Sequence, residues 1–437
     1  MLKGKTVAPL TLGCKVNQYE TDGMIELLKE AGMTAVSFEE KADVYLINTC
    51  SVTNMADKKS RQMIHRAKKL NPDAVVIAAG CYVQAAKDKL MEDDRISIII
   101  GNNKKKDIVQ ILEDYLEIGV TDEGMLDIAA EKEYEPLTIN STLEHTRAYV
   151  KIQDGCNQFC SYCIIPYVRG RIRSRELASI TEEVERLAQT GVKEIVLTGI
   201  HISSYGKDKE NEVGLADVID AISKIESIER IRLGSLEPGI ITDTFIDRIV
   251  DNKKVCPHFH LSLQSGCNTV LKRMNRKYTC KEYFEKCEML RKAFDRPALT
   301  TDVIVGFPGE TDEEFQETVD YLTKLNLYEM HIFKFSPRQG TVAAGMRDQI
   351  GPEIKNQRSD VLLALSEKNK HAYEASFRGE TLEVLIEEKV RRNGKDGYRG
   401  HTERYIDIFV EEECMHRICG REVDIINHIV QIPYGME

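Results

Sequence analysis

The chain has 437 residues, of which 42% are hydrophobic and 30% are charged, so general disorder is excluded and roughly two to four domains are expected. Its 60 basic and 71 acidic residues give a net charge of −11, which disfavours diffuse nucleic-acid binding but leaves room for local basic patches. The first residues lack a signal-peptide pattern, and no stretch is long and apolar enough to span a membrane. We therefore expect a cytoplasmic protein whose twelve cysteines are metal ligands or free thiols rather than disulfides.

Residues 1–120 alternate short apolar runs with helical patterns. The runs at 6–12, 42–48, 74–79 and 96–100 indicate strands, and helices are expected at 18–31 and 54–70. This alternation predicts an α/β domain built on an open parallel sheet. Residues 121–142 are acidic without clear periodicity and are interpreted as a linker.

Residues 143–370 continue the alternation with longer units. Strands are expected at 148–153, 194–198, 230–233, 258–263, 300–305 and 329–335, with helices that include 181–189 and 312–325. Six such units predict a partial (β/α)6 barrel whose chemistry lies in the loops after the strands. Residues 371–437 show shorter runs at 382–386, 405–410, 423–426 and 429–432, which predict a small all-β barrel.

Three cysteines follow the first strand of the expected barrel within eight residues: Cys156, Cys160 and Cys163. Thiolates are the usual ligands of iron–sulfur clusters and also bind zinc. Three thiolates on a four-iron cluster leave one iron open for S-adenosylmethionine, whose carbon–sulfur bond the cluster then cleaves to give a radical. The alternative is a zinc knuckle that a distant cysteine or histidine completes.

Three further cysteines each lie within two residues of the end of an expected N-terminal strand: Cys14, Cys50 and Cys81. Because the carboxyl ends of parallel strands share one edge of a sheet, these thiols could converge on a second cluster. Three unrelated buried cysteines are the alternative, since cysteine is often simply buried.

Several motifs resemble the radical S-adenosylmethionine methylthiotransferase family. They are Leu12-Gly13-Cys14-Lys15-Val16-Asn17, Asn48-Thr49-Cys50-Ser51-Val52-Thr53, Gly80-Cys81, the Cys156–Cys163 loop, the run from Arg169 to Arg175, Leu263-Gln264-Ser265-Gly266 and Gly306-Phe307-Pro308-Gly309-Glu310-Thr311. The similarity covers essentially the whole chain, including a C-terminal barrel similar to the TRAM module. The run that begins Gly13-Cys14-Lys15 resembles the branch that acts on N(6)-threonylcarbamoyladenosine in tRNA.

The resemblance implies an enzyme that replaces the hydrogen on carbon 2 of this adenine, beside the anticodon, with a methylthio group. It implies S-adenosylmethionine and two 4Fe-4S clusters as cofactors. Cys14, Cys50 and Cys81 are then the ligands of the cluster that holds or supplies the sulfur, and Cys156, Cys160 and Cys163 are the catalytic ligands of the radical-generating cluster. The expected partners are a tRNA anticodon stem-loop and an external electron donor, and a monomer is expected.

Polar residues and glycines near the strand ends of the expected barrel are candidates for binding the cofactor. These candidates are Thr198, Gly199, Ser235, Gln264, Asp302 and Gly306, with His201 and Glu237 near by. Glycine permits close backbone approach, whereas each polar side chain has loop capping or a barrel-wall hydrogen bond as its alternative role. For His201, a solvated side chain is the alternative.

Arginines directly after the three-cysteine loop are candidates for binding RNA phosphate, because a guanidinium group binds phosphate in a bidentate manner. They are Arg169, Arg171, Arg173 and Arg175. Arg276 is a further candidate for binding phosphate. Alternatively, it pairs with a carboxylate or caps a helix.

Two other functions remain open at this point. One is a methylthiotransferase of the same family that acts on isopentenyladenosine in tRNA or on a ribosomal protein. The other is a zinc-binding RNA adaptor without catalytic activity.

Overall fold

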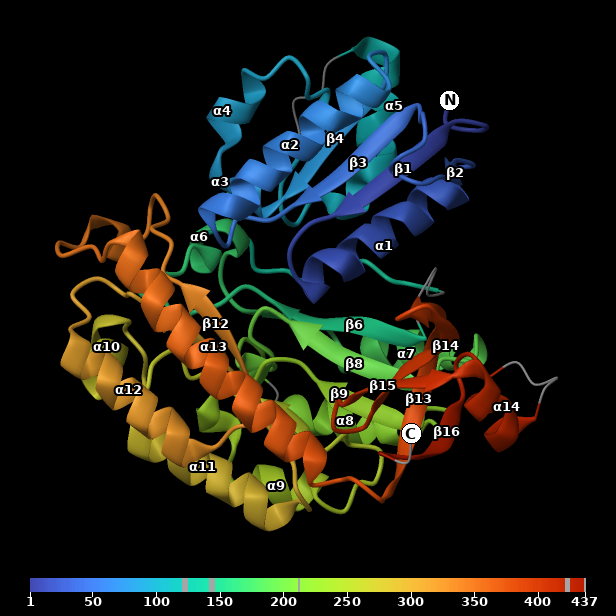
Figure 1. The fold of residues 1–437 in the computed structure, drawn as a ribbon. Coiled ribbons are helices and arrows are strands. Elements are labelled where there is room, and N and C mark those ends of the chain that lie inside the picture. The colour runs from blue at the N-terminus through green and yellow to red at the C-terminus, as the bar shows by residue number, and fades with distance from the viewer. Residues whose placement is uncertain (120–124, 141–145, 211–212, 421–424, 436–437) are drawn as a thin grey trace.

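Three units follow one another along the chain in the computed structural model, which describes all residues except 120–124, 141–145, 211–212, 421–424 and 436–437. The N-terminal unit lies above a central barrel, and the C-terminal sheet packs against one side of that barrel (Figure 1). None of the described helices has the length and apolar character that a membrane crossing requires.

The N-terminal unit is a five-stranded parallel sheet in the order β2-β1-β3-β4-β5. Its strands are β1 (Thr6–Thr11), β2 (Thr34–Ala35), β3 (Val44–Thr49), β4 (Val75–Gly80) and β5 (Ile98–Ile100). The helices are α1 (Lys15–Glu30), α2 (Asn54–Leu70), α3 (Cys81–Ala85), α4 (Lys87–Met91) and α5 (Ile108–Ile118). Apolar clusters cover both faces of the sheet, and β3 is buried at every position. The expected open parallel sheet is confirmed.

The central unit contains six parallel strands in two sheets. Isolated bridges between the β9 and β10 segments connect these two sheets. The strands are β6 (Arg147–Asp154), β8 (Glu194–Gly199), β9 (Arg230–Leu233), β10 (His258–His260), β11 (Ala298–Val305) and β12 (Glu329–Lys334), and the short β7 (Arg173–Ser174) pairs antiparallel with β6. The helices are α6 (Ile165–Arg169), α7 (Leu177–Gln189), α8 (Leu215–Ser223), α9 (Asp243–Ile249), α10 (Asn268–Arg273), α11 (Cys280–Ala293), α12 (Asp312–Leu325) and α13 (Pro352–Ala375). The partial barrel is confirmed, with β12 as an edge strand.

Alternation along the strands gives the barrel an apolar outer face and a polar inner face. On β6, Ala148 and Val150 pack in the main core with helix α7, whereas Arg147 and Tyr149 lie on the opposite face. Helix α1 of the N-terminal unit packs over β6 and β8. The inner face is therefore enclosed partly by the N-terminal unit.

The C-terminal unit is an antiparallel sheet in the order β15-β14-β13-β16. Its elements are β13 (Thr381–Arg392), β14 (Lys395–Thr402), β15 (Asp407–Glu411), α14 (Glu412–Cys419) and β16 (Ile429–Pro433). Helix α14 was not expected, and the strand expected at 423–426 falls partly outside the described residues. Arg232 of β9 donates to the carbonyl oxygens of Thr402 and Glu403, which fixes this sheet against the barrel.

The segment interpreted as a linker packs against the other units where the structure describes it. Ile128, Leu137 and Ile139 are buried, and the Glu135 carboxylate accepts a hydrogen bond from the backbone N–H of Lys106. This segment is therefore part of the interface between the N-terminal sheet and the barrel.

Candidate functional site: two groups of three thiols

The loop after β6 brings Cys156, Cys160 and Cys163 together at the carboxyl end of the barrel strands. Burial raises the pKa of Cys156 to about 11 and that of Cys163 to about 12, and the neighbouring thiols add to both shifts. Without a metal these thiols stay protonated at neutral pH, and metal binding would deprotonate them. The Gln158 backbone N–H lies 3.5 Å from the sulfur of Cys156, and Arg276 donates to Cys160 Sγ at 3.4 Å. Three thiols with N–H donors suit an iron–sulfur cluster.

The second group forms where three separate segments meet at the edge of the N-terminal sheet. Cys14 precedes α1, Cys50 follows β3, and Cys81 begins α3. Burial raises the pKa of Cys50 to about 11, and Cys81 and Cys14 contribute to this shift because they lie close by. A Cβ atom on Gly13, which has φ +104°, would lie 2.7 Å from Cys50 Sγ, so only glycine allows this approach. The sheet thus brings the three thiols together, and this donor set also suits a cluster.

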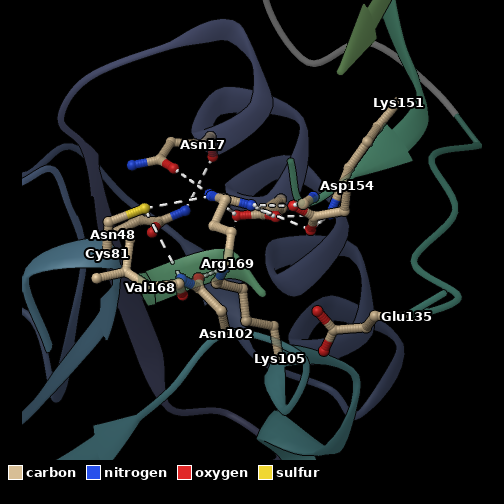
Figure 2. Close-up of polar contacts among 12 residues, drawn as sticks. Asn17, Asn48, Cys81, Asn102, Lys105, Glu135, Lys151, Asp154, Val168 and Arg169 are labelled. Atoms are coloured by element: carbon tan, nitrogen blue, oxygen red, sulfur yellow. Dashed lines mark hydrogen bonds and ion pairs between the residues drawn. The ribbon is translucent and has the colours of Figure 1, made fainter. Parts of the chain in front are cut away.

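Arg169 lies in a buried network between the two groups, and Figure 2 shows it between Cys81 and Asp154. Its Nε atom donates to Cys81 Sγ at 3.2 Å, and its two terminal nitrogens donate to Glu20 Oε1 and Asn17 Oδ1, both at 2.7 Å. One of these nitrogens also lies 3.2 Å from Asp154 Oδ2. Arg169 has no exposed surface, so its charge is neutralised entirely by protein groups.

Lys105 and Lys151 complete this network. The Lys105 Nζ atom lies 2.5 Å from Glu20 Oε2, and Lys151 Nζ lies 2.7 Å from Glu20 Oε1 and 2.6 Å from Asp154 Oδ2. Burial alone would raise the pKa of Glu20, but Arg169 and these two lysines hold it well below its usual range. Glu20 stays ionised and joins α1, which follows Cys14, to β6, which precedes Cys156.

Three of the four arginines expected to bind RNA are buried. Arg173 donates to the carbonyl oxygens of Arg169 and Arg171, and Arg175 forms an ion pair with Glu183. Arg171 is exposed and lies with its guanidinium carbon 4.6 Å from the Phe159 ring centroid. We therefore propose RNA contact only for Arg171, and the guanidinium groups of the other three have protein partners instead.

Arg276 also lies beside the barrel thiols rather than at the surface. Besides Cys160, it contacts Glu237 Oε1 at 3.2 Å. His201 is not solvated, because its Nε2 atom contacts Glu237 and its Nδ1 atom contacts the Ser204 hydroxyl. His201 and Glu237 line a cavity of about 640 Å³ that extends to Gln158 of the cysteine loop.

The residues expected to bind the cofactor lie at or after the ends of β8, β9, β10 and β11, except that Asp302 lies within β11. The backbone N–H of Gln264 donates to the Asp302 carbonyl oxygen at 2.9 Å, and Ser235 is exposed. Gly306 packs against Lys355, and its N–H donates to Glu310. Their role in binding the cofactor remains a prediction, as it does for Thr198 and Gly199.

Sequence reasoning missed the buried network. Glu20, Lys105 and Lys151 were not singled out, although Lys151 lies between apolar residues of its strand. A charge in such a run is the signal that could have pointed to a buried ion pair. The two histidines beside the predicted Asp302 were also missed; His260, Asp302 and His331 hold side-chain atoms within 4.8 Å of one another.

Two family models match the chain. Residues 150–322 match the radical SAM superfamily, and residues 6–101 match a family described as Uncharacterized protein family UPF0004. Among solved structures, the radical S-adenosylmethionine methyltransferase TsrM from Kitasatospora setae has a TM-score of 0.56 at 16% identity, and the match covers 78% of this chain and 77% of TsrM. This likeness concerns the fold alone.

Curated relatives match over nearly the full length. The threonylcarbamoyladenosine tRNA methylthiotransferase MtaB of Bacillus subtilis is 42% identical over 98% of this chain and 93% of its own length. The MtaB protein of Aquifex aeolicus is 40% identical over 92% of this chain and 96% of its own length. The tRNA-2-methylthio-N(6)-dimethylallyladenosine synthase of Thermoanaerobacter pseudethanolicus is 36% identical over 94% and 89%. With two groups of three thiols, a radical-SAM barrel and these relatives, the chain belongs to the radical S-adenosylmethionine methylthiotransferase family.

Proposed function

We propose that this chain is a tRNA methylthiotransferase that converts N(6)-threonylcarbamoyladenosine beside the anticodon to its 2-methylthio derivative. The two relatives of highest identity named above carry this activity in their names. The relative named for dimethylallyladenosine is less similar, so threonylcarbamoyladenosine is the favoured substrate.

The observation that supports this reaction best is the contact between the two thiol groups through one buried network. Arg169 touches Cys81 of the first group and Asp154, which lies two residues before Cys156 of the second. A reaction that delivers sulfur to a carbon radical needs both centres in one fixed geometry. The zinc adaptor has no such need, because structural zinc sites do not have to face each other.

The cofactors are S-adenosylmethionine and two 4Fe-4S clusters, which when bound supply the radical, the methyl group and the sulfur. Cys156, Cys160 and Cys163 would hold one cluster, and Cys14, Cys50 and Cys81 the other. Arg276 would donate to the sulfur of Cys160, and Arg169 to that of Cys81. Hydrogen bonds to cluster sulfurs orient the ligands and tune the reduction potential.

The substrate is the anticodon stem-loop of a tRNA, an external donor supplies electrons, and the enzyme works as a monomer in the cytoplasm. Arg171 is the residue of the cysteine loop region whose charge is open to RNA phosphate.

The test is nucleoside analysis of tRNA from cells that lack this protein, together with anaerobic reconstitution of the purified enzyme. We expect loss of the 2-methylthio derivative of threonylcarbamoyladenosine in the cells and its formation in the assay. Loss of the methylthio derivative of isopentenyladenosine would instead identify the other tRNA substrate, and an unchanged tRNA profile would exclude both. A colourless, zinc-replete protein from anaerobic purification would support the adaptor.

A further inference from the structure

The inner face of the barrel carries several polar and charged side chains that are paired within the protein. Arg147 pairs with Glu387 at 3.3 Å and Arg232 with Glu194 at 2.7 Å, and the imidazole of His260 lies 3.4 Å from the Asp302 carboxylate. Two further side chains, Lys15 and His331, have neither an ion pair nor a hydrogen bond within the described part of the chain. An accessible ammonium group without a protein partner is free to bind an anionic ligand.

Lys15 holds a particular place on this wall. It is the first residue of α1, directly after Cys14, and its side chain is accessible. Its Nζ atom lies 5.9 Å from the centroid of the Tyr149 ring on β6. Its charged neighbours come from three strands, with Arg147 on β6, Glu194 on β8 and Arg232 on β9. Two of these three neighbours are cations, so the protein itself does not balance the lysine charge.

A buried histidine lies close to Lys15 and to the same charged groups. Burial holds the pKa of His258 well below its usual range, and the nearby Arg232, His260, Lys15 and His331 lower it further. His258 stacks on Tyr405 of the C-terminal unit with ring centroids 5.3 Å apart. The surroundings of Lys15 therefore favour an anion over a neutral ligand.

We propose that Lys15 selects the substrate by receiving the carboxylate of its threonylcarbamoyl group, an inference that rests on the proposed function. Carbon 2 of adenine, which gains the sulfur, is separated by a single ring nitrogen from carbon 6, which carries this group. When carbon 2 faces the thiol group of Cys14, Cys50 and Cys81, the threonylcarbamoyl group lies in the same space, beside the residue that follows Cys14. An ammonium–carboxylate contact there is a charge-assisted hydrogen bond.

The isopentenyl group of the alternative substrate is an apolar hydrocarbon that offers Lys15 no partner. Its binding would desolvate the ammonium group without compensation, which penalises the wrong substrate. An RNA phosphate is the other anion that this lysine could meet. The two sources differ because phosphate is present in every stem-loop, whereas the carboxylate is present only in the modified one.

The experiment compares two anticodon stem-loops of identical sequence, one with threonylcarbamoyladenosine and one with unmodified adenosine. Dissociation constants are measured with the cluster-loaded enzyme without reductant, so that no turnover occurs. The wild-type enzyme should prefer the modified stem-loop by about 10- to 100-fold. Lys15→Met should remove this preference, and Lys15→Arg should retain most of it. Lys29→Met, at the other end of the same helix and about 20 Å away, is the matched control and should retain the preference.

Two results would overturn this inference. One is a Lys15→Met enzyme with normal iron content that still prefers the modified stem-loop. The other is an equal loss of affinity for both stem-loops, which would assign Lys15 to RNA phosphate. The proposed function fails separately, if the wild-type enzyme with reductant and S-adenosylmethionine does not methylthiolate the modified stem-loop.

Discussion

The two groups of three thiols reach similar arrangements by different routes. Cys156, Cys160 and Cys163 lie on one loop of eight residues, so local chain geometry brings them together. Cys14, Cys50 and Cys81 come from three segments of a parallel sheet, and they meet only because β1, β3 and β4 lie side by side. The first group depends on a loop, whereas the second depends on the folded sheet and on the network around Arg169.

The two thiol groups therefore differ in how strongly they depend on the rest of the fold. A local loop can fold around a metal with little help from the rest of the chain. The N-terminal group needs the register of three strands, the glycine at position 13 and the guanidinium group that touches Cys81. We therefore expect the N-terminal group to be the more sensitive of the two to changes far from its cysteines.

The largest expected effect separates the two groups directly. Replacing Cys14, Cys50 and Cys81 together by alanine should remove about half of the roughly eight irons and abolish the methylthio product, yet spare cleavage of S-adenosylmethionine. Replacing Cys156, Cys160 and Cys163 should also halve the iron and should abolish cleavage as well. Iron content and 5′-deoxyadenosine formation are the measurements. Full iron in the first triple variant would refute the second cluster.

Arg169→Met tests how far the N-terminal group depends on the network. Removing this cation leaves the buried Glu20 and Asp154 with two lysines and the more distant Arg173, at a cost of about 3–5 kcal/mol in unfolding free energy. The reduction potential of the N-terminal cluster should become more negative, because a positive charge and a hydrogen bond to its ligand are lost. Urea unfolding and a redox titration followed by electron paramagnetic resonance measure the two effects.

The matched control for this change is Arg171→Met, two residues away and exposed, which should alter stability by about 0.5 kcal/mol or less. Arg169→Lys should restore part of the stability but not the contact with Cys81, since lysine lacks the forked donor geometry. Equal potentials for wild type and Arg169→Met would mean that the arginine only joins the two domains.

The raised thiol pKa values that the two groups share can be tested by thiol reactivity in the metal-free protein. The pKa values of Cys50 and Cys156 are both raised to about 11 by burial, so at pH 7 the thiolate fraction is about 100-fold below that of a free thiol. Their alkylation rates should rise about tenfold per pH unit between pH 7 and pH 10. The alkylation rate of each cysteine is measured by mass spectrometry after iodoacetamide treatment, with glutathione as the reference. A Cys156 that reacts like glutathione at pH 7 would show that the loop opens without its metal.

The smallest expected effect concerns the RNA contact beside the loop. Arg171→Gln should weaken tRNA binding several-fold and reduce the slope of log affinity against log salt by about 1. Lys253→Gln is the control, because Lys253 is exposed but lies before β10, at the opposite end of the barrel strands. An unchanged salt slope for Arg171→Gln would exclude this phosphate contact.

Much of the fold followed from the sequence because strands and helices alternate with clear periodicity. The helices at Asn54–Leu70 and Asp312–Leu325 and the strand at Arg230–Leu233 have the expected bounds. Each is defined by local signals, such as the Thr53 and Thr311 caps. Helix α14 was missed because its run of eight residues lies among short apolar segments that were interpreted as strands.

The sequence by itself determined the cysteine loop and its position after a strand, because three ligands within eight residues form a local pattern. It also placed Cys14, Cys50 and Cys81 at strand ends, which made their convergence a reasonable expectation. Only the tertiary structure decided that Arg169, Arg173 and Arg175 point inward, because burial depends on the N-terminal sheet that packs on the loop. Likewise, it left Lys15 without a partner, because the charges of the barrel wall come from strands far apart in the chain.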